Sequence, residues 1–134
     1  MIEFPSKTRI HNTAENIYNF LADFNNFKNI IPEERVKNYR STKETCAFQV
    51  ENMPEFRLKM GTNKPVTTIE MVPESSSGIH FMLSISLEPC TESTTEVTLK
   101  LQADLNPFMK MMAGKALQTF VDTLAVKLKN HMEC

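Results

Sequence analysis

The spacing of apolar residues changes three times along this chain. Residues 2–11 alternate, with Ile2, Phe4 and Ile10 on one side and polar side chains on the other, which is the period of a half-buried strand. Helical spacing follows, then a long region of short alternating runs, and finally helical spacing again. The pattern therefore predicts a strand, a short helical region, a group of strands and a C-terminal helix.

Two short helices are predicted after the first strand. Thr13 is placed to accept a hydrogen bond from the first turn, and Glu15 favours the positive end of the helix dipole. Either Asp23 or Asn25 is placed to cap a second helix, and Pro32 ends the pattern. We therefore expect a kink between the two helices. The apolar residues at helical spacing are Ile17, Phe20, Leu21, Phe24, Phe27, Ile30 and Ile31.

Residues 34–104 predict six short strands in an antiparallel meander. Clusters of turn-forming residues interrupt the alternation at 40–43, 51–54, 61–65, 73–78 and 89–93. Between them apolar and polar residues alternate, so one face of the sheet is apolar and the other is polar. The apolar face needs a covering layer, which the helices must supply.

A long C-terminal helix is predicted from Asn106-Pro107 to about Asn130, because asparagine caps a helix and proline is tolerated at the first helical position. Its apolar stripe is expected to face the sheet. Small residues in the first half of this stripe predict looser packing there, so any space for a ligand is expected beneath that half. The stripe consists of Met109, Ala113, Ala116, Leu117, Phe120, Val121, Leu124 and Leu128, with Lys115, Asp122 and Lys129 opposite.

Together these elements predict an α+β fold. We expect a seven-stranded curved antiparallel sheet, two short helices, and a long C-terminal helix packed across the sheet. A chain of 134 residues is long enough to bury about two thirds of its unfolded surface around one core. The whole chain, 1–134, is therefore expected to be a single domain.

Two stretches resemble a known superfamily. The run A-E-N-I-Y-N-F-L-A-D at 14–23 is similar to the opening of the first helix in the SRPBCC superfamily, and L-Q-T-F-V-D-T-L at 117–124 is similar to its closing helix. The order of elements over the whole chain also resembles its helix-grip fold, found in START lipid-transfer domains, the birch pollen allergen family and polyketide cyclases. The resemblance implies a cavity between the long helix and the sheet, and it names no ligand.

The composition argues against some classes of binding partner. Fifteen basic residues nearly balance sixteen acidic ones, so no strong field steers the protein to nucleic acid or anionic lipid. Cys46, Cys90 and Cys134 are an odd set without metal-ligand spacing, which favours free thiols in a reducing cytoplasm. The N-terminus lacks a signal-peptide pattern, and no apolar run approaches membrane-spanning length. We therefore expect a cytoplasmic protein without stable membrane insertion.

The residue types of common catalytic and metal sites do not cluster in the sequence. His11, His80 and His131 lie far apart, and His80 is expected on the polar face of its strand. The three glycines form neither a phosphate-binding loop nor a Gly-x-Ser-x-Gly elbow. We therefore expect no metal, no cofactor and no catalytic constellation.

Our first hypothesis is binding or transport of a small hydrophobic ligand, such as a lipid, quinone or polycyclic compound, between the long helix and the sheet. The expected cavity lining is Phe48, Val50, Phe56, Leu58, Met60, Ile69, Met71, Phe81, Leu83, Ile85, Ala113, Ala116, Leu117 and Phe120. The expected cavity entrance is Tyr18, Arg35, Tyr39, Phe108, Met109 and Met112.

Two other functions stay open at this point. An enzyme of the cyclase, dehydratase or hydrolase type requires an inward polar group near the entrance, for which Tyr18, Tyr39 and Arg35 are the candidates. A protein-interaction module would fill the cavity with its own side chains and use the methionine-rich start of the last helix for a partner, including a second copy in a homodimer.

Overall fold

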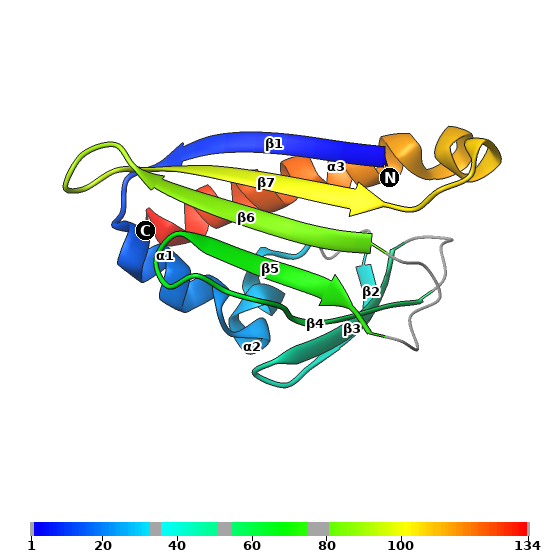
Figure 1. The fold of residues 1–134 in the computed structure, drawn as a ribbon, viewed down its shortest axis with the longest axis horizontal. Helices are drawn as coiled ribbons and strands as arrows, with labels where there is room; N and C mark the ends of the chain where they lie inside the picture. The colour runs from blue at the N-terminus through cyan, green and yellow to red at the C-terminus, as the bar shows by residue number, and fades with distance from the viewer. Residues whose placement is uncertain (1, 33–35, 51–54, 75–80, 134) are drawn as a thin grey trace.

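The order of helices and strands is the one that the sequence predicts. The computed structural model describes residues 2–32, 36–50, 55–74 and 81–133 (Figure 1). Arg35, His80, the turn at 51–54 and most of the turn at 73–78 therefore lie outside the described residues. The elements are β1 (Ile2–Ile10), α1 (Ala14–Leu21), α2 (Phe24–Phe27), the 3-10 turn η1 (Lys28–Ile30), β2 (Val36–Ser41), β3 (Thr45–Val50), β4 (Glu55–Met60), β5 (Thr68–Pro73), β6 (Phe81–Pro89), β7 (Thr95–Ala103) and α3 (Pro107–Met132).

The strands form one curved antiparallel sheet in the order β1-β7-β6-β5-β4-β3-β2. The first strand pairs with the last, with Ile2 opposite Ala103 and Ile10 opposite Thr95. The helices cover the apolar face: α3 packs most closely on β1, β7 and η1, while α1 packs on β5 and β6 (Figure 1). The predicted α+β helix-grip architecture is confirmed.

The predicted helix caps are also confirmed, and Asp23 rather than Asn25 caps the second helix. After α2 the chain tightens into η1 before Pro32, which accounts for the end of the helical pattern. The capping side chains accept hydrogen bonds from backbone N–H groups as follows: Thr13 from Asn16 (3.2 Å), Asp23 from Asn25 (2.9 Å) and Asn106 from Met109 (2.8 Å).

The C-terminal end of α3 is fastened to the turn after β1. Asn12 Nδ2 donates a 2.7 Å hydrogen bond to the carbonyl of Met132, and the backbone N–H of His11 donates to Glu133 at 2.8 Å. These bonds hold the helix to Met132, slightly beyond the predicted end. The buried residues of α3 are Ala113, Leu117, Phe120, Val121, Leu124, Ala125 and Leu128, whereas Met109 and Ala116, which we placed on the stripe, are only partly buried.

Side chains of α3 also reach the free edge of β1. Gln118 Nε2 donates to the carbonyl of Pro5 at 3.0 Å, and Lys129 Nζ donates to the carbonyl of Arg9 at 2.7 Å. Because β1 ends the sheet, these carbonyls have no neighbouring strand to accept from. The helix therefore both covers the core and satisfies the edge of the sheet.

The opposite edge strand, β2, contains a β-bulge. Its register shifts between Lys37 and Arg40, so Asn38 and Tyr39 stand opposite the single residue Phe48. Asn38 has a φ of 58°, in the left-handed region that asparagine tolerates better than most residues. The extra residue reverses the alternation, so that Tyr39 faces the core and Arg40 faces outward.

Candidate functional site

A cluster of phenylalanine rings bridges α3 and the far half of the sheet. Phe120 comes from α3 and the other rings from β3, β4 and β6, so the cluster spans the region where the sheet curves away from the closely packed β1 side. Phe48 is its centre, because it contacts all three others. The centroid distances are 5.7 Å from Phe48 to Phe56, 6.4 Å to Phe81 and 5.9 Å to Phe120, with 4.2 Å between Phe56 and Phe81.

These rings belong to the lining predicted from the sequence, and the structure brings that set together on the inner face. The buried members are Phe48, Val50, Phe56, Leu58, Ile69, Met71, Phe81, Leu83, Ile85, Ala113, Leu117 and Phe120; Met60 and Ala116 are partly buried. Each of the four clustered rings is at most 2% exposed. In this conformation the rings contact one another closely, so a molecule of their size enters only if some of them rotate away.

Tyr39 and Cys46 form the polar margin of the ring cluster. The Tyr39 ring stacks on Phe48, and its hydroxyl donates a 2.7 Å hydrogen bond to the carbonyl of Phe24. Burial raises the pKa of Tyr39 well above its ordinary value, and burial also raises the pKa of Cys46 to about 12. Both groups are therefore neutral near pH 7, and neither is prepared to act as a base or a nucleophile.

The structure separates the residues predicted to form the cavity entrance. Phe108, Met109 and Met112 lie together at the start of α3, with Phe108 and Met112 exposed and Met109 partly buried. Tyr39 is partly buried against the core, and Tyr18 is in α1, near the opposite, C-terminal end of α3 (Figure 1). Of the predicted entrance residues that the structure describes, Phe108 and Met112 at the helix start are the exposed ones.

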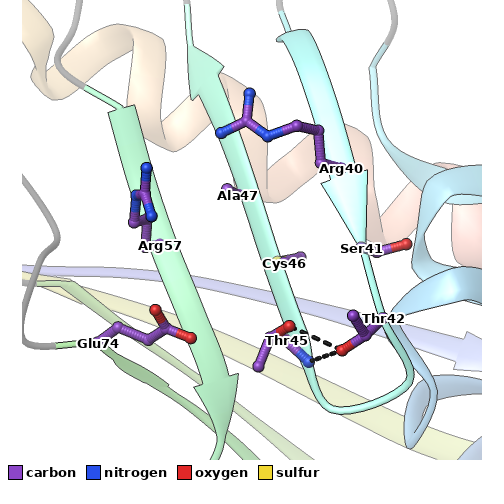
Figure 2. Close-up of a pocket in the computed structure, with 8 residues that line it drawn as sticks. All are labelled: Arg40, Ser41, Thr42, Thr45, Cys46, Ala47, Arg57 and Glu74. Carbon is purple, nitrogen blue, oxygen red and sulfur yellow. Dashed lines mark hydrogen bonds between the residues drawn. The ribbon is translucent and has the colours of Figure 1, made fainter.

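A cleft of about 200 Å³ lies over β2, β3 and β4, and sequence reasoning missed it. Arg40 and Arg57 flank Ala47 (Figure 2). Glu55 accepts from both guanidinium groups, at 2.9 Å from Arg40 and 2.8 Å from Arg57, and the bond from Arg40 contributes most to holding the pKa of Glu55 below its ordinary value. The residues that line this cleft are Arg40, Ser41, Thr42, Thr45, Cys46, Ala47, Arg57 and Glu74.

A second cleft, of about 450 Å³, opens at the end of β4. Met60 lines it and also packs against the core, so the predicted lining reaches the surface here. Gly61 is required beside it, because a Cβ at this position would lie 2.9 Å from Cγ1 of Val72. The lining is Ala22, Lys43, Glu44, Thr45, Lys59, Met60, Gly61 and Asn63.

Within 2–32, 36–50, 55–74 and 81–133, no group of three or more His, Cys, Asp or Glu residues is arranged to hold a metal ion. Over the same ranges, each buried side-chain nitrogen or oxygen has a hydrogen-bond partner. No helix in the described part of the chain has the length and hydropathy needed to cross a membrane.

Comparison with solved structures decides the type of fold. The KanY protein matches with a TM-score of 0.81 at 13% identity, covering 99% of this chain and 98% of that one. A START superfamily protein from Mycobacterium smegmatis matches with a TM-score of 0.70 at 16% identity, covering 98% and 97%. The chain has an SRPBCC-type fold.

The chain is also similar in structure to the di-domain ARO/CYC protein BexL from the BE-7585A biosynthetic pathway. It matches with a TM-score of 0.72 at 16% identity, covering 97% of this chain and 46% of that one. Neither a protein-family model nor a curated protein sequence matches the chain. In this chain, the phenylalanine cluster occupies the region between helix and sheet in which the resemblance implied a cavity.

Proposed function

We propose that this protein binds a small, largely apolar, planar molecule between α3 and strands β3 to β6. The contact between Phe48 of β3 and Phe120 of α3, with ring centroids 5.9 Å apart, carries the proposal. Side chains rather than close backbone packing join the helix to this part of the sheet, and side chains can change rotamer. A ligand that replaces one or two ring contacts with its own would leave the backbone in place.

The chemistry of the interior supports an apolar ligand. The inner faces of β3, β4, β5 and β6 present apolar side chains, and the hydroxyl of Tyr39 is already used by the Phe24 carbonyl. Every buried side-chain polar atom of the described residues already has a hydrogen-bond partner, so none of these atoms is free to orient a ligand. Affinity would therefore come from buried area and from ring contacts, at about 25 cal/mol per Å² of apolar surface.

The ring geometry supports a planar ligand in particular. Phe48 meets Phe56 and Phe81 edge to face and meets Phe120 nearly parallel, at 22°. Edges and faces of aromatic rings are complementary, so an aromatic or quinone ring system can replace a phenylalanine ring with similar contacts. A quinone or polycyclic compound therefore suits this interior better than a flexible acyl chain.

A non-binding interaction module is the second candidate, and the near-zero exposure of the four rings favours it. Under that alternative the rings are a permanent core. The enzyme alternative has less support, because the inward hydroxyl of Tyr39 donates a hydrogen bond to the backbone carbonyl of Phe24 and its pKa is raised by burial.

Thermal unfolding with a panel of quinones and polycyclic aromatics, together with native mass spectrometry, tests the proposal. We expect at least one compound to raise the melting temperature and to appear as a stoichiometric adduct. Phe120→Leu, which removes a ring from the cluster, should change the affinity several-fold. Phe24→Leu makes the same change in a buried ring of α2 that pairs with Phe27 instead, and should leave the affinity unchanged.

An absence of binding would support the second candidate, the interaction module. If no compound in the panel shifts the melting temperature or forms an adduct with a well-folded protein, the interior is a filled core.

A further inference from the structure

The start of α3 exposes large apolar side chains. Phe108, Met111 and Met112 are 67%, 81% and 71% exposed, and we call these three residues the tip patch. This end of α3 extends past the ends of β1 and β7 (Figure 1), so the sheet does not cover it. Exposed Phe and Met side chains gathered at a projecting end are typical of a surface that meets another apolar phase.

The charged side chains on the first turns of α3, beside the tip patch, are positive. Residues 105–121 include Lys110 and Lys115 and no acidic residue, although the whole chain carries a formal net charge of −1. Both lysines are exposed, and Lys115 follows Met111 and Met112 by one helical turn, on the same side of the helix. Glu3, near the start of β1, is paired with Lys100 at 3.4 Å. The nearest acidic residues along the chain are Asp104 and Asp122.

We propose that the tip patch docks on an anionic lipid surface. Phe108, Met111 and Met112 enter the interface, while the ammonium groups of Lys110 and Lys115 stay at the level of the lipid headgroups. The docking is peripheral, and it does not depend on whether the interior binds a ligand. Docking is consistent with the balanced net charge, because Lys110 and Lys115, rather than a long-range field of the whole protein, supply the attraction to anionic lipid.

Charge favours lipid over a second copy of this chain. Apposing two tip patches would bring Lys110 and Lys115 of both copies close together, and the repulsion would oppose such a dimer. Anionic headgroups neutralise the same lysines. The unbranched methionines also suit a fluid interface, because they adapt to irregular surroundings.

Vesicle flotation tests the docking. The protein is mixed with vesicles of phosphatidylcholine alone, or of phosphatidylcholine containing about 30% phosphatidylglycerol. We expect flotation with the anionic vesicles only, weakening as salt is raised. Met111→Gln with Met112→Gln should lower the bound fraction about tenfold, and Lys110→Gln with Lys115→Gln should remove the salt dependence.

Val126→Gln is the matched control, because Val126 is also an exposed apolar residue of α3, at 57%, but is distant in sequence from the tip patch. It should float like the unmodified protein. Three results would overturn the proposal: no flotation of the unmodified protein with anionic vesicles, an equal loss in Val126→Gln, or a dimer in solution that the two methionine substitutions dissociate.

Discussion

The ring of Tyr39 stacks on the ring of Phe48 across the edge of the sheet, with centroids 6.0 Å apart and planes at 28°. Regular alternation from Val36 would have turned Tyr39 outward. The bulge adds one residue, turns the phenol inward, and lets it close one side of the ring cluster. The position of Tyr39 therefore depends on the backbone of Asn38, which leads to the first prediction.

Substitutions at Asn38 should separate backbone strain from side-chain loss. Asn38→Gly keeps access to the φ of 58° and should change the free energy of unfolding by only a few tenths of a kcal/mol, whereas Asn38→Val should cost about 1–2 kcal/mol. Urea denaturation measures both. Lys37→Val introduces the same side chain at the neighbouring exposed position of β2 and should be close to neutral; an equal cost at both positions would show that the bulge is not the cause.

Two glycines should respond oppositely to alanine. At Gly114, inside α3, a Cβ meets only ordinary contacts at 3.8 and 3.9 Å, so Gly114→Ala should stabilise the protein by about 0.5–1 kcal/mol. At Gly61 the Cβ would lie 2.9 Å from Val72, so Gly61→Ala should destabilise it by about 1–3 kcal/mol. Thermal and urea unfolding compare the two variants directly, and a shift in the same direction would contradict the prediction.

The buried thiol of Cys46 should make the protein sensitive to alkali. Its pKa is raised from 9.0 to about 12, so its contribution to stability is complete below pH 9.0 and is lost as the pH rises from 9.0 toward 12. Cys46→Ala should move the onset of alkaline destabilisation upward, toward the range set by Tyr39, whose ordinary pKa is 10.0. The midpoint of urea unfolding, measured through this pH range, checks the prediction. As a control, Cys90→Ala removes an exposed thiol and should leave the pH dependence of the midpoint unchanged.

Thr95 fastens β7 to the turn after β1. The side chain is fully buried, and its Oγ1 donates a 2.9 Å hydrogen bond to the carbonyl of Asn12. Thr95→Val keeps the shape and removes the donor, so it should cost about 1–3 kcal/mol, while Thr95→Ser retains the bond and should cost less. If serine proves more destabilising than valine in urea unfolding, packing rather than the hydrogen bond dominates at this position.

The fold could be predicted because its signals are local. Alternation, helical spacing and caps such as Thr13 and Asn106 depend on a few neighbouring residues, and they gave the element order correctly. The inward orientation of Phe48, Phe56 and Phe81 followed from the same alternation. Whether the rings meet one another depends on how strongly the sheet curves around α3, which no short sequence pattern reports.

The cleft between Arg40 and Arg57 could not be predicted for a related reason. These side chains become neighbours through the pairing of Arg40 with Ala47 and of Ala47 with Arg57, which requires the register of three strands. The bulge shifts that register by one residue, and the spacing of Val36 and Tyr39 along the chain does not by itself show where the extra residue lies. The same bulge turns Tyr39, which the sequence predicts at the cavity entrance, toward the core, where it is partly buried.

The two edge strands of the sheet affect whether copies of this protein can polymerise at high concentration. An unpaired strand edge is a template on which another chain can add, as in amyloid growth. Here Gln118 and Lys129 of α3 occupy carbonyl groups of β1, and the bulge interrupts the regular row of free groups along β2. The molecule can therefore expose an apolar helix end without also offering a straight strand edge on which copies of itself could polymerise.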